Sequence, residues 1–168
     1  MSVADDIARV AKQEKRLAFT AFDEATAFSI GSALRERALA EKLPVVIQVS
    51  VWDRLLFYAA LPGSSSSNFD WVRRKINVVK MFQKSTYRMV LEQNSPDRAF
   101  KTGHGLPVTD YVLAGGGFPV RVRGAGVIGA ITVSGLPQRQ DHAIVVDALC
   151  DHLGISRHEL ALPPAFGS

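Results

Sequence analysis

Two spacings of hydrophobic residues alternate along the chain, one typical of helices and one typical of strands. Apolar side chains recur every three or four residues in four segments, which predicts helices over residues 3–16, 24–42, 71–91 and 140–153. Alternating or β-branched runs predict strands over residues 17–22, 45–51, 55–61, 119–123 and 127–134. The last four strands form two antiparallel hairpins, because a short turn separates the members of each pair. Hairpins that alternate with helices favour an α+β fold, a central antiparallel sheet with helices on its faces, over parallel βαβ units.

The ends of the third predicted helix carry recognisable signals. The serine-rich residues 62–69 are interpreted as a loop, with Asn68 or Asp70 as the N-cap of the helix over residues 71–91. Asn, Ser and Pro at residues 94–96 end that helix.

A single domain accounts for the whole length of 168 residues, since no internal repeat or shift in composition marks a second one. We expect a core over residues 17–155, preceded by the helix over residues 3–16 and followed by a frayed tail over residues 161–168.

The composition narrows the class of protein. Hydrophobic residues make up 47% and charged residues 21%, as in ordinary soluble globular proteins. A net charge of +4 permits anionic partners without requiring them. The single cysteine, Cys150, excludes an intrachain disulfide and is expected to be a small buried hydrophobic residue, not a nucleophile. No apolar run approaches a membrane span or a signal peptide, so the cytoplasm is the expected location.

Residues 124–129, Gly-Ala-Gly-Val-Ile-Gly, have the spacing of a dinucleotide-binding turn. In that motif the last glycines open a helix whose N–H groups hold a pyrophosphate. Here the following residues are mostly β-branched, and Gly135 and Pro137 would stop a helix after about two turns. We therefore interpret residues 124–126 as a hairpin turn, and Gly129 as a strand position that another backbone or a ligand approaches closely.

The strongest charge feature is the helix predicted over residues 71–91, which contains no acidic residue. Its six cations are Arg73, Arg74, Lys75, Lys80, Lys84 and Arg88. A solvated helix face, a site for a small anionic ligand and a nucleic-acid surface are the three interpretations. Nucleic acid is the least favoured, because no helix-turn-helix pattern or platform of stacking aromatic residues accompanies the cations.

The histidines offer chemistry without a recognisable motif. They are His104, His142, His152 and His158, and no HExxH or CxxC pattern predicts a metal site. We expect Asp141 to be a helix-capping carboxylate and His142 to be partly exposed. His104, between two glycines, lies either in a surface turn or in a loop over a pocket. No nucleophile motif occurs, so no catalytic residue is assigned.

Three segments together resemble one known family: residues 71–75 after the serine-rich loop, residues 116–119, and residues 128–142 with their Ser-Gly-Leu-Pro and Asp-His pattern. In this combination the chain resembles the haem-degrading-domain superfamily of GlcG, HbpS and the PduO C-terminal domain, and within it a branch of uncharacterised small proteins. The resemblance covers about residues 17–155. It implies a profilin-like or PAS-like three-layer fold and assembly into homo-oligomers, either dimers or larger.

The resemblance also implies haem or tetrapyrrole binding, seen in some relatives, and iron release in one branch. Relatives can bind haem through a histidine of an N-terminal helix, whereas residues 1–103 here contain no histidine. A haem site in this chain would need another ligand, namely His104, His142, His152, Tyr87 or Tyr111.

The favoured hypothesis is a non-enzymatic, cytoplasmic homo-oligomer that binds a small anionic ligand, with tetrapyrrole among the candidates. An enzyme of haem degradation or redox metabolism that uses the same pocket, and an assembly factor that acts through its outer surface, are the alternatives. The expected ligand-binding residues are Arg74, Lys75, His104, Gly117, Phe118, Pro119, Asp141 and His142.

Overall fold

The computed structural model describes residues 2–165, which form six α-helices, one 3₁₀ turn and four strands. In chain order the elements are α1 (Val3–Arg16), α2 (Glu24–Ala40), β1 (Val46–Val51), β2 (Arg54–Ala60), α3 (Ser66–Phe82), α4 (Thr86–Gln93), η1 (Thr102–His104), β3 (Gly117–Val122), β4 (Gly126–Ser134), α5 (Gln138–Leu153) and α6 (Arg157–Leu160).

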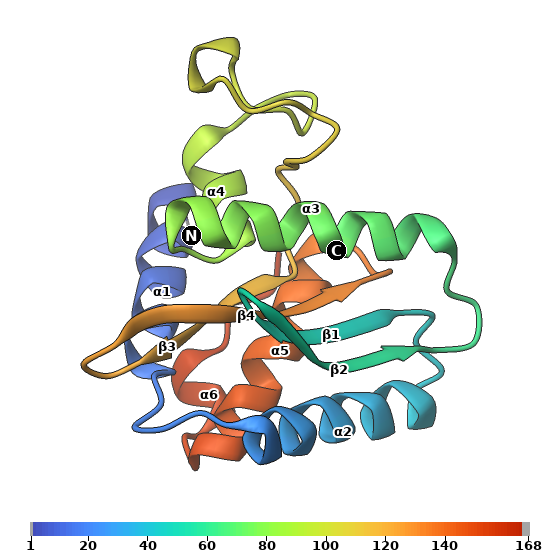
Figure 1. Ribbon diagram of the computed structural model, residues 1–168. Helices are drawn as coiled ribbons and strands as arrows, with labels where there is room; N and C mark the ends of the chain where they lie inside the picture. Colours follow the sequence, from blue (N-terminus) through green and yellow to red (C-terminus); the bar gives the residue numbers. More distant parts are fainter. Residues whose placement is uncertain (1, 166–168) are drawn as a thin grey trace.

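The four strands form one antiparallel sheet in the order β2-β1-β4-β3. Helix α3 crosses one face of this sheet, and α2 and α5 cover the other (Figure 1). The predicted α+β architecture, a central antiparallel sheet between helices, is therefore confirmed. Residues 94–112, which we call the arm, project beyond α3 and α4 (Figure 1).

The two faces of the sheet differ in chemistry because successive residues of a strand point to opposite sides. Toward α2 and α5 the face is apolar: Ile47, Val49, Ile131 and Val133 are completely buried in the main hydrophobic core. Toward α3 the alternate positions are polar or small, among them Gln48, Ser50, Thr132 and Ser134. The side chains that face α3 therefore form one buried polar region of the molecule.

The prediction of one helix over residues 71–91 is wrong in its start and in its length, because two helices, α3 and α4, occupy this region. Helix α3 begins at Ser66 with Ser65 as N-cap, and Asn68 lies inside the first turn, where its side chain accepts hydrogen bonds from Ser65. It ends at Phe82, because Gln83 adopts a left-handed conformation with φ of 59°. A separate helix α4 then starts after Ser85, whose hydroxyl accepts the Arg88 N–H. Asn94 ends α4 as predicted.

The strand predicted over residues 17–22 is also wrong, since only Phe19 pairs with the sheet, as an isolated bridge to Val122. The Phe19 N–H donates to the Arg121 carbonyl, and the Phe19 carbonyl accepts from the Arg123 N–H. These bonds fasten the chain to the outer edge of β3 without extending the sheet.

The glycine-rich turn between β3 and β4 has the predicted form. Gly124 and Gly126 both have positive φ, 84° and 87°, and join the two strands of a hairpin. A Cβ atom at Gly129 would lie 2.1 Å from the Ser50 carbonyl oxygen, so this glycine permits the close approach of β1. No helix within residues 2–165 is long and apolar enough to span a membrane.

Residues 161–165 lie outside helix and strand, and the Pro163 carbonyl accepts a hydrogen bond from Arg139. The rest of the predicted frayed tail, residues 166–168, lies outside the described part of the chain.

Candidate functional site

A buried ion pair between Lys75 and Asp141 forms the centre of the candidate site. The Lys75 Nζ lies 3.2 Å from the Asp141 Oδ2, and it donates to the Val133 carbonyl at 3.0 Å. Each residue is only 2% exposed. Lys75 is buried because it follows Val72 by three positions and precedes Val79 by four, which places it on the helix face that packs against the sheet.

Asp141 lies in the first turn of α5 and also organises the turn that precedes that helix. Its carboxylate accepts the backbone N–H groups of Leu136 at 3.0 Å and Gly135 at 3.3 Å. The expected role as a cap is thus corrected. Asp141 binds N–H groups of the β4–α5 turn, whereas the residue at the N-cap position of α5 is Pro137.

The ion pair opens into a hollow of about 180 Å³, which we call the Lys75 hollow. Its walls come from α3, the arm and the segment after it, the β4–α5 turn and the start of α5. The polar side chains that line it are Asn68, Lys75, Arg98, Ser134, Gln138 and Asp141, and Trp71 adds an aromatic surface. The site is therefore small and strongly polar, with two cations and one carboxylate.

Arg98 and Trp71 form the side of the hollow that faces the arm. The Arg98 guanidinium carbon lies 5.5 Å from the centre of the Trp71 ring, and that of Arg74 lies 4.4 Å from it. Arginines at these distances are attracted to the face of an indole ring. Arg98 is exposed and has a positive φ of 61°. Its charge is thus available to an anion at the rim of the hollow.

Burial shifts both members of the ion pair toward their neutral forms. Desolvation lowers the pKa of Lys75, opposed by the attraction of Asp141, and the Arg98 charge lowers that pKa further. Desolvation also raises the pKa of Asp141, against the stabilising effects of Lys75 and the two backbone N–H groups. The free-energy difference between the ionic pair and a neutral amine–acid pair is therefore smaller than in water.

Arg74 lies beside the hollow without lining it. Its Nε is 3.1 Å from an oxygen of Asp70, and its Nη1 donates to the Val108 carbonyl at 3.3 Å. The bond to Val108 connects α3 to the arm, while Asp70 and Trp71 of the same helix hold the guanidinium in place. Arg74 therefore has a structural role, in which it holds the arm against α3.

Gly117, Phe118 and Pro119 belong to the buried part of β3, away from the lining of the hollow. The Gly117 N–H donates to the Thr86 hydroxyl at 2.9 Å, and Phe118 is part of the main core. Their sequence pattern therefore reflects the packing of β3, with Gly117 beneath α3 and α4 and Phe118 on the opposite face toward α5.

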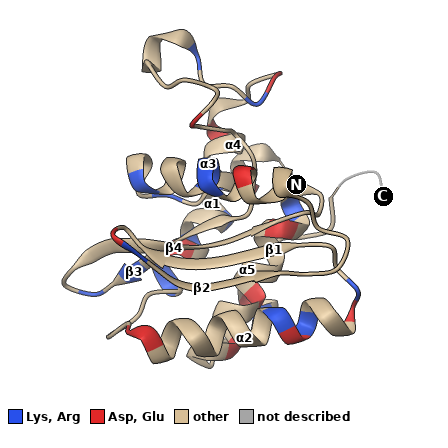
Figure 2. Cartoon of the chain, turned by 45° about the vertical axis from the view of Figure 1, so that its right-hand side comes forward, with Lys and Arg blue, Asp and Glu red and all other residues tan. Residues whose placement is uncertain are grey.

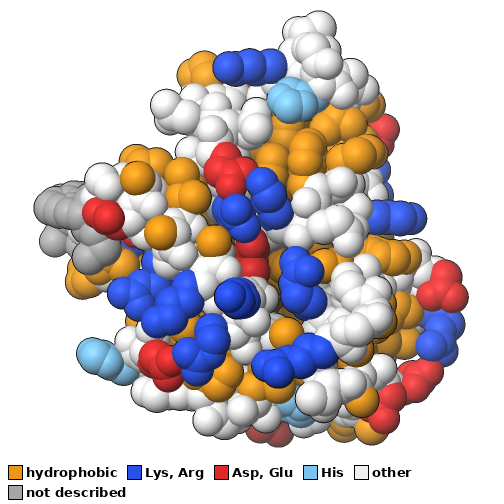
Figure 3. Space-filling view, turned by 90° about the vertical axis from the view of Figure 1, so that its left-hand side faces the viewer, with side chains coloured by type: hydrophobic (Ala, Val, Ile, Leu, Met, Phe, Trp, Pro, Cys, Tyr) orange, Lys and Arg blue, Asp and Glu red, His pale blue; other side chains and the backbone are white. Residues whose placement is uncertain are grey.

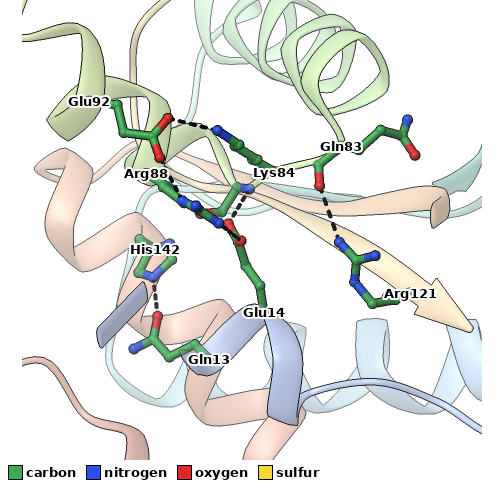
Figure 4. Close-up of polar contacts among 9 residues, drawn as sticks. Gln13, Glu14, Gln83, Lys84, Arg88, Glu92, Arg121 and His142 are labelled. Atoms are coloured by element: carbon green, nitrogen blue, oxygen red, sulfur yellow. Dashed lines mark hydrogen bonds and ion pairs between the residues drawn. The ribbon is translucent and has the colours of Figure 1, made fainter. Parts of the chain in front are cut away.

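The two histidines of the predicted site lie in opposite environments. His104 is exposed in η1, where its ring meets Phe100 and Phe82 with ring centres 5.7 and 6.3 Å apart. His142 is 1% exposed, so the expectation of partial exposure is wrong. Its Nε2 lies 2.7 Å from the Gln13 Oε1, because α1 packs over this end of α5 (Figure 4). Burial lowers the pKa of His142 to about 3, so the ring is neutral and donates to Gln13.

Glu14 is the carboxylate at the centre of a second buried polar region. It accepts the Ser85 N–H at 2.7 Å and pairs with Arg88 at 2.8 Å (Figure 4). We call the group Gln13, Glu14, Ser85, Arg88 and His142 the α1 seam. It connects α1 to α4 and α5, and it explains why the helix predicted over residues 71–91 is interrupted at Ser85.

Most cations of the predicted basic helix are paired with carboxylates of α3, α4 or the arm. Arg73 pairs with Asp70 and Asp110, and Lys84 and Arg88 pair with Glu92. Figure 2 shows acidic segments beside the basic ones of α3 and α4. Basic side chains also gather on the face shown in Figure 3. Lys15, Arg88, Arg121 and Arg123 line one shallow hollow together with Glu14.

Cys150 is buried, as expected, and burial raises the pKa of its thiol to about 11. A thiol of this kind is a weak nucleophile at neutral pH. Among residues 2–165 no group of three histidine, cysteine or acidic side chains is placed to hold a metal ion.

Sequence reasoning identified Lys75 and Asp141 but missed Asn68, Arg98, Ser134 and Gln138 as lining residues of the same hollow. Lys75 carried a usable signal, a cation on the apolar stripe of a helix. Arg98 carried none, since it lies in an irregular loop whose path depends on contacts with α3.

A sheet covered by helices on both faces defines an α+β protein, and the Lys75 hollow is its candidate site. The family model described as "Haem degrading protein HbpS-like" matches residues 22–150. The chain therefore belongs to the HbpS-like haem-degrading protein family, as its motifs suggested.

Relatives and solved structures agree with this assignment. The chain is 68% identical over 162 residues to "UPF0303 protein mlr5144" of Mesorhizobium japonicum, which covers 96% of this chain and 97% of that protein. The crystal structure of the Ybr137w protein has a TM-score of 0.80 at 24% identity, covering 88% of this chain and 87% of the other. A PduOC:Heme complex has a TM-score of 0.62 at 19% identity, with 79% and 94% covered. These structures support the fold.

Proposed function

We propose that this protein binds a small carboxylate-type anion in the Lys75 hollow. The observation that carries the proposal is the buried Lys75–Asp141 pair, which opens into a polar volume with Arg98 at its rim. A volume of about 180 Å³ lies below the range of about 300–1,000 Å³ typical of sites for drug-sized ligands, so the ligand has few heavy atoms. Arg98 supplies the charge-assisted hydrogen bonds that select a carboxylate.

Isothermal titration calorimetry with pyruvate, oxalate and inorganic phosphate tests this proposal. Arg98→Ala should weaken binding about tenfold to a hundredfold, because a hydrogen bond to a charged group contributes about 1.5–3 kcal/mol. Arg123→Ala is the matched control, since Arg123 is also exposed but lies in the β3–β4 turn outside the hollow. Equal affinity in wild type and Arg98→Ala, or no heat with any of the three anions, would contradict the proposal.

The family description suggests haem as a ligand. Three hollows among the described residues lack the side chains that would bind haem iron. No histidine lines the Lys75 hollow, the cleft between α3 and the β1–β2 hairpin, or the hollow beneath residues 161–165. His142 is bonded to Gln13 in the interior, and the Tyr87 hydroxyl accepts from Arg139 at 2.9 Å. The residues at these places do not form a pocket with an axial ligand for haem iron.

His104 favours a second candidate function, haem binding on the outside of the arm. Its imidazole is exposed and lies beside the partly buried ring of Phe82, which stacks on the buried ring of Phe100. Titration of the protein with hemin, followed at the Soret band, tests it. A saturable shift that His104→Ala abolishes and His158→Ala preserves would support this function, and the absence of a saturable shift would reject it.

We further propose that the chain forms homo-oligomers in the cytoplasm. Exposed apolar side chains near one end of α3 support self-association: Phe69 is 51% exposed, Leu55 59%, and Tyr58 packs edge-on to Phe69. Native mass spectrometry of freshly purified protein reports the stoichiometry and any ligand that co-purifies, and a monomer alone would contradict the oligomer. Cell fractionation tests the location.

A further inference from the structure

We propose that Lys75 forms an imine with a small 2-oxo acid bound in the Lys75 hollow. This inference rests on the proposed function, because the acid must first occupy that hollow. It goes further in assigning a covalent role to Lys75 and a carbonyl group to the ligand.

The position of the Lys75 amine suits this reaction. The side chain is 2% exposed, yet it lines the hollow, so a ligand inside can reach it while bulk water is largely excluded. Two hydrogen-bond directions of Nζ are used, toward Val133 and Asp141. No third acceptor for Nζ occurs among residues 2–165, which leaves one direction for a ligand.

Asp141 supplies the proton transfer that the reaction needs. An amine attacks a carbonyl carbon only when it is unprotonated, and Asp141 lies 3.2 Å from Nζ, close enough to take its proton directly. The pair is buried, so a neutral amine beside a neutral carboxylic acid is accessible there. The same carboxyl group then holds the proton that the departing oxygen requires.

The other polar groups select the ligand. Arg98 at the rim offers a charge for a carboxylate, while the lysine lies on the floor of a hollow of about 180 Å³. A carbonyl next to a carboxylate satisfies both groups within this small volume. A 2-oxo acid of a few carbon atoms is therefore the class of ligand that the hollow favours.

The step balances without an added oxidant or reductant. Nζ of the neutral amine bonds to the carbonyl carbon, the C=O electron pair moves to oxygen, and one proton passes from nitrogen to that oxygen. Asp141 then donates its proton to the resulting hydroxyl group, the C–O bond breaks, and water leaves. The product is a protonated C=N bond beside an ionised Asp141, so the total charge is that of the starting ion pair.

Reductive trapping tests the inference. The full-length protein is incubated with pyruvate and sodium cyanoborohydride, and the adduct is located by intact-mass measurement and peptide mapping. The expected result is one adduct per chain at Lys75, with the mass of pyruvic acid less one oxygen. Acetate in excess, a carboxylate without a ketone, should protect Lys75. Lys80→Met, which removes an exposed lysine of the same helix, should leave the yield unchanged.

Lys75→Arg keeps a cation beside Asp141 but has no amine that can form an imine. This variant should give no adduct at position 75, and its circular dichroism should match that of the wild type. Adducts spread over exposed lysines, with none at Lys75 in the wild type, would overturn the inference without relying on any variant. If calorimetry still finds pyruvate binding that depends on Arg98, only the covalent step fails. If binding is also absent, the proposed function fails with it.

Discussion

Asp141 and His142 are adjacent in α5, yet they belong to two different buried polar regions. In the α1 seam, Glu14 uses both carboxylate oxygens and Gln13 bonds both His142 and the Leu160 carbonyl. The His142 Nδ1 is buried there without a hydrogen-bond partner among residues 2–165, and no hollow opens onto it. At the Lys75 hollow, an equally buried ion pair faces a lined volume and has a hydrogen-bond direction left over. The difference separates polar groups that hold helices together from polar groups that are arranged to meet a ligand.

The largest change in the free energy of unfolding should come from Lys75→Met, which leaves the Asp141 carboxylate buried without its cation. Loss of one partner from a buried ion pair costs about 3–5 kcal/mol. Urea unfolding should show that loss, and the double variant Lys75→Met/Asp141→Asn should recover much of it because the unpaired charge is gone. A loss below about 1 kcal/mol for the single variant would show that the pair is well solvated from the hollow.

Glu14→Gln should weaken the α1 seam by about 1.5–3 kcal/mol, the contribution of hydrogen bonds to a charged group. The replacement keeps an acceptor for the Ser85 N–H but loses the charge that faces Arg88. Urea unfolding measures the loss, while pyruvate binding should be unchanged. A variant that loses binding while keeping its stability would contradict the separation of the two regions.

The pH dependence of stability should reveal the neutral His142 of the seam. Its pKa is lowered from 6.5 to about 3 in the folded protein, so the unfolded chain binds more protons between these values. Stability should therefore fall as pH decreases through 6.5, by about 1.5–2 kcal/mol between pH 6.5 and 5 from this group alone. Urea unfolding at several pH values, compared with His142→Gln, measures it. Identical pH slopes in the two proteins would show that His142 titrates normally.

Arg98→Ala should have the smallest effect on folding, below about 0.5 kcal/mol, because Arg98 is exposed. The same substitution is expected to remove most of the affinity for a small carboxylate. Urea unfolding and calorimetry on the same preparation measure both. A large loss of stability would make Arg98 a structural residue that holds Trp71 and the arm, and would weaken its assignment to a ligand.

The sequence predicted the architecture well because its hairpins and three of its helices are local patterns. It failed where a distant segment decides the outcome. Glu14 accepts the Ser85 N–H from 71 positions away, and this bond favours the start of a new helix at Ser85. No glycine or proline lies near Ser85 to predict that break from the local sequence. Gln13 contacts His142 from 129 positions away, so the sequence around His142 could not predict that this histidine is buried. Lys75 and Asp141 were named as separate candidates, but their pairing depends on how α3 lies across the sheet.

The NMR signals of the two tryptophan indole N–H groups test the central claim most directly. Trp71 lines the Lys75 hollow, whereas Trp52 lines the separate cleft between α3 and the β1–β2 hairpin, where its Nε1 donates to the Val127 carbonyl. With the two signals assigned through Trp52→Phe, titration with pyruvate should shift the Trp71 signal saturably and leave that of Trp52 in place. A shift of Trp52 alone, or no shift of either signal, would contradict a small-anion site at Lys75 and Asp141.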